Sequence, residues 1–187
     1  MASDRAANDY FGKSVSISGN YVIVGVYADD EDAAGLNTLS NAGSAYIFSK
    51  DQGGTDKWGQ TTKIVAEGSR YILANNYGNS VAIDGDYAVV GASNEDKDGT
   101  GANVLADAGA VYILKYNGTT WGEIKKIVAS DRATNDYFGY SVSIRAAILL
   151  LGHTTKMKMN RGPIRSSMPV LPIYLQKTRA GPTTGDR

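Results

Sequence analysis

Residues 1–144 alternate short apolar runs with polar turns, at a spacing typical of β-strands. Residues 14–17 alternate polar and apolar side chains with a period of two, which predicts a half-buried strand. Residues 21–24 are almost wholly apolar, as expected for a strand covered on both faces. The turn between them contains Gly19, which can adopt a positive φ, so an antiparallel pair is expected. No 3.6-residue apolar period of useful length is present, and helices are not expected in this part of the chain.

The same reading gives two further strands in each half of this region. Third strands are expected at residues 44–49 and 110–115, and fourth strands at residues 63–66 and 123–128. Asn117-Gly118 favours a two-residue type I′ hairpin, because that turn needs positive φ at both central residues. The pattern therefore predicts two groups of four antiparallel strands.

An internal repeat accounts for this grouping. Residues 2–17, ASDRAANDYFGKSVSI, return with few changes as residues 129–144, ASDRATNDYFGYSVSI, and residues 77–83 form a weaker copy between them. The repeat unit is 61 to 66 residues long. Four-stranded units in tandem are typical of β-propeller blades, which bury their apolar faces against their neighbours. An all-β propeller fragment is expected, with blades at about 11–66 and 77–128 and the first strand of a third at 138–144.

Aromatic-glycine pairs recur in the shared register of the repeat, each in front of a strand, and a further glycine follows the second strand. These residues are Phe11, Gly12, Gly25, Tyr77, Gly78, Gly91, Phe138 and Gly139. On them, residues 2–144 resemble the FG-GAP repeat family, the blades of integrin α-chain type propellers, common also in large bacterial secreted or surface proteins. Unrelated aromatic-glycine dipeptides would not share one register. The aromatic ring is expected to fill the space between blades, and the glycine to let backbones approach closely.

The composition changes abruptly after Ile144. Residues 1–144 carry 11 Lys and Arg against 18 Asp and Glu, whereas residues 145–187 carry 8 against 1. If the residues from 145 onward are read as a shifted codon frame, their codons permit strings close to the first repeat, including one close to residues 42–59. Residues 145–187 are therefore interpreted as a non-native, frameshifted tail without a native fold, arising from a sequencing error or a disabling mutation. The alternative is a natural basic tail that binds nucleic acid or an acidic surface.

Catalytic constellations are mostly absent from the sequence. There is no Cys, and His153, the only His, lies in the tail, so no Ser-His-Asp or Cys-His arrangement is available. No phosphate-binding or zinc-protease motif is present. Tyr46, Phe48 and Tyr112 lie in strand patterns and are expected to pack rather than to bind sugars or bases. The sequence therefore predicts that the chain is not an enzyme.

Calcium is not expected as a required cofactor. Many FG-GAP blades hold calcium in an Asp-x-Asp-x-Asp-Gly loop after the Phe-Gly strand, but that connection is reduced here to residues 18–20 and 84–86. Acidic residues gather one connection later, so a displaced metal site remains an alternative to solvated loops. Its candidate ligands are Asp29, Asp30, Asp32, Asp96 and Asp98.

The resemblance implies a non-catalytic extracellular binding, adhesion or scaffold module, with a protein or glycan ligand and no specific nucleic acid. One alternative is the platform of a larger propeller enzyme whose active site lies elsewhere, and another is nucleic-acid binding through the basic tail. The expected location is secreted or at the cell surface, although residues 1–5 do not open a signal peptide. Residues 146–151, the longest apolar stretch, are too few to cross a bilayer, so no membrane insertion is expected.

Overall fold

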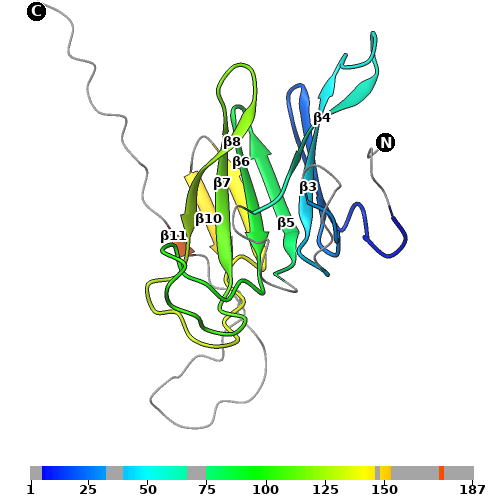
Figure 1. Cartoon of the computed structure of the whole chain (residues 1–187). Coiled ribbons are helices and arrows are strands. Elements are labelled where there is room, and N and C mark those ends of the chain that lie inside the picture. The colour runs from blue at the N-terminus through cyan, green and yellow to red at the C-terminus, as the bar shows by residue number, and fades with distance from the viewer. Residues whose placement is uncertain (1–5, 33–39, 67–74, 146–147, 153–172, 175–187) are drawn as a thin grey trace, which may run out of the picture.

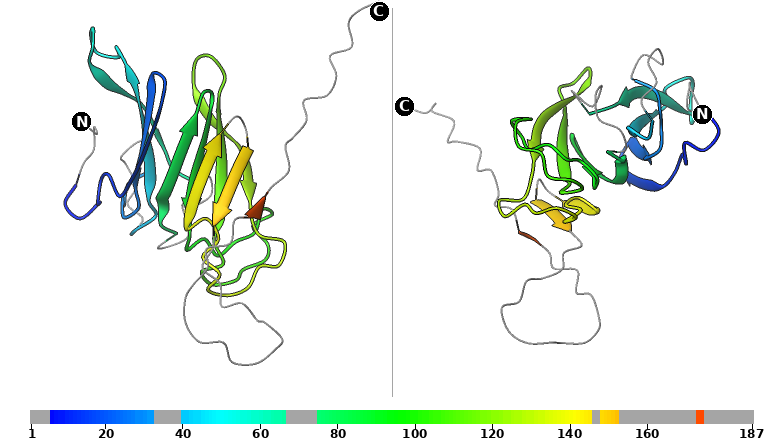
Figure 2. Two further views of the ribbon diagram at one scale, coloured as in Figure 1. Left: turned by 180° about the vertical axis from the view of Figure 1, so that it is seen from behind. Right: turned by 60° about the horizontal axis from the view of Figure 1, so that its bottom comes forward.

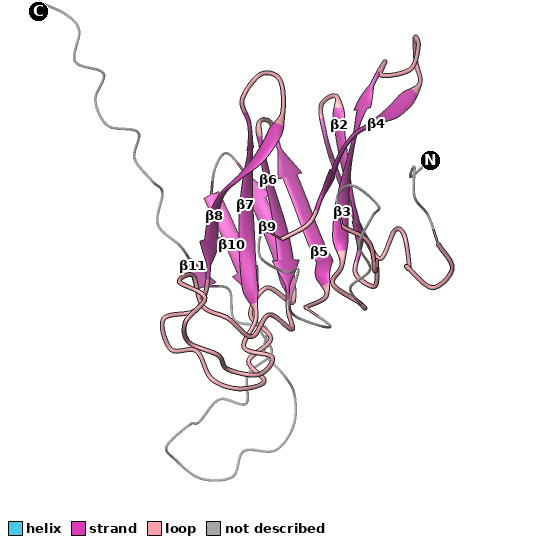
Figure 3. Ribbon diagram, viewed as in Figure 1, coloured by secondary structure: helices cyan, strands magenta, loops and turns pink. Residues whose placement is uncertain are grey.

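The computed structural model describes residues 6–32, 40–66, 75–145, 148–152 and 173–174. These residues form strands, turns and loops, which confirms the all-β expectation (Figure 3). Since none of the described residues is helical, none belongs to a helix that could cross a membrane.

The first sheet contains four antiparallel strands in sequence order: β1 (Ser14–Ser18), β2 (Tyr21–Val26), β3 (Ser44–Lys50) and β4 (Trp58–Ile64). Gly19 takes a φ of 52° in the tight turn between β1 and β2, as the sequence predicts. The fourth strand begins earlier than expected, at Trp58 instead of residue 63. Its first half lacks an alternating apolar pattern because Gly59 and Gln60 interrupt it, so periodicity alone misses it.

The second sheet repeats this arrangement with β5 (Tyr77–Asp84), β6 (Tyr87–Ala92), β7 (Ala110–Tyr116) and β8 (Trp121–Ile127). The predicted type I′ hairpin at Asn117-Gly118 is wrong. A four-residue loop, residues 117–120, joins β7 to β8, and of its residues only Gly118 has positive φ. The Asn117 side-chain oxygen accepts hydrogen bonds from the backbone N–H groups of Thr119 and Thr120, both 2.9 Å long, and this capping favours the longer loop.

A third sheet begins with β9 (Ser141–Arg145) and continues with β10 (Ile148–Gly152) and β11 (Ile173–Tyr174), in the order β11-β10-β9. Ser141 pairs with Gly152 as Ser14 pairs with Gly25, so the repeat register continues past residue 144 to residue 152. Antiparallel pairing needs an extended, apolar run rather than particular residues, and residues 148–151 supply one. The rest of the predicted tail, residues 153–172 and 175–187, lies outside the described residues.

The three sheets lie side by side, as Figure 1 and the two views of Figure 2 show. Their first strands contact one another, β1 against β5 and β5 against β9. One apolar core joins the first two sheets and includes Ile23 and Ile47 from the first with Val81 and Ile83 from the second. A smaller core, centred on Val89, lies between the second sheet and β9. The two complete sheets are thus arranged as neighbouring propeller blades.

Candidate binding surface

A serine and two glycines form the junction between successive blades. The Ser14 hydroxyl donates a 2.9 Å hydrogen bond to the Gly78 carbonyl oxygen. That oxygen lies 2.0 Å from the position that a β-carbon on Gly25 would occupy, so only glycine fits there. The same junction recurs one blade later, where Ser80 donates a 2.8 Å hydrogen bond to the carbonyl oxygen of Gly139.

Sequence reasoning missed the part played by these serines. Ser14, Ser80 and Ser141 occupy the same place in the three copies of the repeat, and this recurrence was the available signal. The sequence predicts close backbone approach at the glycines. The structure adds that Gly78 and Gly139 contribute their carbonyl oxygens as acceptors.

The aromatic residues of the repeat differ in how far they are covered. Tyr77 is fully buried in the core between the first two blades, and Phe138 is buried against the second blade. Phe11 lies against its own blade, with its ring 5.7 Å from that of Tyr46, and 46% of it remains exposed. A neighbouring blade therefore covers the motif aromatic in two of the three copies.

The strand that follows shows the same contrast. Val15 and Ile17 in β1 are 64% and 65% exposed, whereas the equivalent Val81 and Ile83 in β5 are 7% and 4% exposed. The difference arises because β5 lies against the first blade, whereas no described residue covers Val15 and Ile17 of β1 to the same extent.

The longest connections of the two blades leave the sheets at corresponding ends. The first joins β2 to β3 and the second joins β6 to β7; the second forms much of the loop cluster at the bottom of Figure 1. All five predicted metal candidates lie in these connections. The arrangement of their side chains decides whether this end is a metal site or a rigid protein surface.

Asp29 is a buried carboxylate with several partners from its own blade. Its oxygens accept hydrogen bonds from the hydroxyls of Ser44, at 2.5 Å, and Tyr46, at 2.9 Å. The ammonium group of Lys63 lies 3.0 Å away, and each side chain of this ion pair is only 4% exposed. The backbone N–H of Glu31 also donates to Asp29, at 2.8 Å. A carboxylate satisfied in this way holds the loop against the sheet.

Glu95 occupies the equivalent place in the second blade. Its carboxylate accepts hydrogen bonds from the Tyr112 hydroxyl, at 2.8 Å, and from the Lys97 backbone N–H, at 2.9 Å, and it pairs with the Lys126 ammonium group at 3.3 Å. Burial, followed by the nearby charge of Glu95, raises the pKa of Tyr112 far above the ordinary value for tyrosine. The Asn75 side-chain amide adds a further hydrogen bond to Glu95, at 3.1 Å.

Comparison of the two blades shows a compensating exchange of side-chain length. The first blade combines the shorter Asp29 with Ser44, whose hydroxyl reaches the carboxylate. The second combines the longer Glu95 with Ala110, which has no hydroxyl. A carboxylate, a lysine and a tyrosine are retained in both, so each blade builds the same buried polar cluster from different parts. This cluster was not predicted from the sequence.

The other metal candidates cap their own loops. Asp30 accepts a 2.6 Å hydrogen bond from the Asn41 backbone, and Asp96 accepts one of 2.8 Å from the Asp107 backbone. Asp98 accepts from both the hydroxyl and the backbone of Thr100 and from the Asn103 side chain, and these hydrogen bonds, Thr100 first, hold the pKa of Asp98 well below its usual range. Asp32 is half-buried. Within the part of the chain that the structure describes, no three acidic or histidine side chains are grouped to hold a metal ion.

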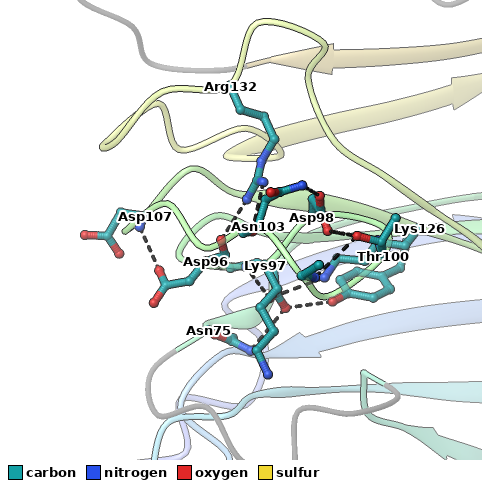
Figure 4. Close-up of polar contacts among 12 residues, drawn as sticks. Asn75, Asp96, Lys97, Asp98, Thr100, Asn103, Asp107, Lys126 and Arg132 are labelled. Carbon is teal, nitrogen blue, oxygen red and sulfur yellow. Dashed lines mark hydrogen bonds and ion pairs between the residues drawn. The ribbon is translucent and has the colours of Figure 1, made fainter.

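Arg132, at the start of the third repeat, connects the loop between β6 and β7 to the next blade. Its guanidinium donates to the backbone oxygen of Asp96 at 2.8 Å and to that of Asn103 at 3.3 Å (Figure 4). The bonds cross from one repeat to the loop of the preceding one. The loop is therefore held at both of its ends and by its neighbour.

The FG-GAP repeat family matches residues 1–48, 58–114 and 121–162. The chain belongs to the FG-GAP repeat family. The third match extends beyond residue 144, in agreement with the pairing of β10. No curated protein matches the chain.

The opposite end of the second FG-GAP blade carries a shallow depression of about 710 Å³, bordered by Asp86, Lys115, Tyr116 and Glu123. Beside it, the ring of Trp121 lies 5.4 Å from those of Tyr21 and Tyr116. Trp121 is 6% exposed and packs between FG-GAP blades, whereas Trp58 at the equivalent position is 40% exposed. The predicted packing roles of Tyr46, Phe48 and Tyr112 agree with their burial.

Proposed function

We propose that these FG-GAP blades form a non-catalytic binding, adhesion or scaffold module that acts outside the cell or at its surface, with a protein or glycan as ligand. The observation that carries the proposal is the fixed loop between β6 and β7. Asp96 and Asp98 accept hydrogen bonds from within the chain, so these carboxylates fix the shape of the loop and the loop presents a rigid outer surface.

The shape of this loop supports recognition of a large ligand. Lys97 and Val104 form an antiparallel bridge across it, and the residues between them turn back through the Asp98 hydrogen bonds. Thr100 and Val104 are exposed at this end, and Val104 is 60% exposed. A preorganised surface loses little conformational entropy when it binds, which favours a binding role.

Ligand screening of the whole chain tests the proposal. The folded chain is presented to glycan arrays and to panels of extracellular proteins, and the binding it shows is remeasured with T100A/V104A. A loss of at least tenfold in affinity is expected, because both side chains lie on the proposed surface.

T119A is the matched control, since Thr119 is exposed in the loop at the opposite end of the same blade. Binding should be unchanged in this variant. Equal losses in both variants, or turnover of a substrate by the purified chain, would contradict the proposed function.

A further inference from the structure

The second blade holds three side chains that together have the composition needed to form a covalent cross-link. They are the amine of Lys126 and the carboxamide of Asn75, both labelled in Figure 4, and the carboxylate of Glu95, which contacts both of the others. Glu95 Oε1 lies 3.3 Å from Lys126 Nζ, and Glu95 Oε2 lies 3.1 Å from Asn75 Nδ2. Glu95 therefore contacts the amine through one of its oxygens and the amide through the other.

The amide and the carboxylate of this group are buried, and the Lys126 side chain is 17% exposed. Asn75 is fully buried and Glu95 is 3% exposed. The ring of Tyr112, itself 1% exposed, carries the Lys126 ammonium group 5.4 Å from its centre. The reaction needs the lysine as a free amine, and the Glu95 carboxylate, 3.3 Å from Lys126 Nζ, is placed to take its proton.

An unsatisfied atom points to the same reaction. Among the described residues, Asn75 Oδ1 is buried with no hydrogen-bond partner. Buried carbonyl oxygens are almost always paired in native proteins, so an orphaned one marks a special site. Once Glu95 is protonated it becomes a donor, and rotation of the amide would let it donate to Oδ1 and polarise the carbon that an amine attacks.

We propose that Lys126 and Asn75 join through an isopeptide bond formed with the help of Glu95. Lys126 Nζ, as the free amine, attacks Asn75 Cγ. The new Cγ–Nζ bond forms, the Cγ–Nδ2 bond breaks, and Glu95 relays the proton lost by the amine to Nδ2, which leaves as ammonia. Overall, a lysine ammonium and a carboxamide become a secondary amide and an ammonium ion, and Glu95 returns to a carboxylate. The step needs no oxidant, reductant or other co-reactant.

The first blade supplies an internal comparison. Its Lys63 pairs with Asp29 as Lys126 pairs with Glu95. The position equivalent to Asn75 is Asp9. The Asp9 backbone oxygen accepts a 3.4 Å hydrogen bond from Ala28, two residues after β2, and the Asn75 backbone oxygen accepts one of 3.3 Å from Asn94, two residues after β6. Asp9 has no amide nitrogen to release. The ammonia-releasing reaction is thus confined to the second blade.

The bond would link the segment just before β5 to β8. These two strands are the first and the last of the second sheet. It would close a loop of about fifty residues, which restricts the unfolded chain as a disulfide does. This chain contains no cysteine, so no disulfide is available for that purpose.

Intact mass spectrometry of the whole chain tests the proposal. The fraction measured is monomeric by size-exclusion chromatography and β-rich by circular dichroism. The expected mass is about 17 Da below that of the sequence, from the loss of ammonia, and tryptic digestion is expected to release one branched peptide containing residues 75 and 126. The full sequence mass in this folded fraction would overturn the proposal.

Three variants separate the cross-link from other routes to the same mass. K126R keeps the positive charge but cannot form the bond, and E95Q removes the proton relay; both should restore the full mass. K63R, the matched change in the first blade, should keep the deficit. A deficit that survives K126R would come from cyclisation of an asparagine with its own backbone and would overturn the proposal. The branched peptide from the unaltered chain is direct evidence that does not depend on any variant folding.

Discussion

The carbonyl oxygen of Gly78 occupies the space in which a β-carbon on Gly25 would lie, 2.0 Å from its ideal position. Each of these glycines belongs to a different copy of the repeat, so the contact joins two blades through their backbones. The Ser14 hydroxyl closes the junction by donating to the same oxygen. Any side chain at either glycine would push the first strand of one blade away from its neighbour.

G78A and G12A measure this close approach separately from backbone strain. Both glycines have similar positive φ, 87° and 91°, but a β-carbon on Gly78 would lie 2.1 Å from the Ser44 oxygen, whereas one on Gly12 would meet nothing within 4 Å. G12A is expected to lower the free energy of unfolding by about 1–2 kcal/mol through left-handed strain alone. G78A should lose about 1–3 kcal/mol more through steric overlap. Urea denaturation measures both, and equal losses would contradict the junction.

I83A and I17A compare the same residue of the repeat in covered and uncovered positions. Ile83 is 4% exposed and Ile17 is 65% exposed. Removal of the buried side chain leaves a cavity, so I83A should lower the free energy of unfolding by about 2–4 kcal/mol. I17A should change it by less than about 0.5 kcal/mol. Thermal or urea unfolding followed by circular dichroism gives the difference, and a large loss in I17A would show that β1 is covered.

D29A tests the buried polar cluster of the first blade. It removes the carboxylate that pairs with the buried Lys63 ammonium group and that accepts hydrogen bonds from the Ser44 and Tyr46 hydroxyls. A loss of about 3–5 kcal/mol in the free energy of unfolding is expected. D30A is the control, because Asp30 is exposed and caps a loop; its loss should stay below about 1 kcal/mol. Similar losses from the two variants would remove the special role of Asp29.

Calcium is expected to have no effect on the described blades, because their acidic side chains are engaged in separate hydrogen bonds. Isothermal titration of the whole chain with calcium chloride should give no heat of binding, and the melting temperature should not rise with millimolar calcium. The contrary outcome is micromolar binding that D96A/D98A abolishes. Such a result would establish the displaced metal site in the second blade.

The reading frame beyond Ile144 is tested on the DNA. We propose that a base gained or lost near codon 145 explains the altered composition of residues 145–187. Independent sequencing of the source DNA should show that change, followed by codons for a third complete repeat. An unbroken frame in every read would leave a natural basic tail as the interpretation.

Recurrence in the sequence predicted the fold well. The strand pattern and the repeated aromatic-glycine pairs predicted two four-stranded blades, because strand periodicity and tight turns depend on nearby residues. The start of β4 at Trp58 was missed because it depends on pairing with the neighbouring strand. The loop after Tyr116 was missed because a single asparagine side chain, that of Asn117, decides its length. The strand β10 was missed for a similar reason: it pairs with β9 through its backbone, and exact residues matter little there.

The site was harder to predict than the fold. Asp29 and Glu95 look like other acidic loop residues in the sequence, and nothing local indicates that Lys63 and Lys126 reach them from the last strand of each blade. These contacts join residues more than 30 positions apart. Comparison of equivalent positions between the repeats could have found them, because an acid, a tyrosine and a lysine keep their places in both blades.

The junction made by Ser14, Gly25 and Gly78 also bears on how such chains can change in evolution. Its contacts use one hydroxyl, two positions without side chains and a backbone oxygen, all of which every copy of the repeat brings with it. A duplicated unit therefore carries a compatible surface on each side from the moment it arises. Gain or loss of whole units need not be followed by compensating substitutions at the junction, whereas the loops at the end of each blade remain free to diverge.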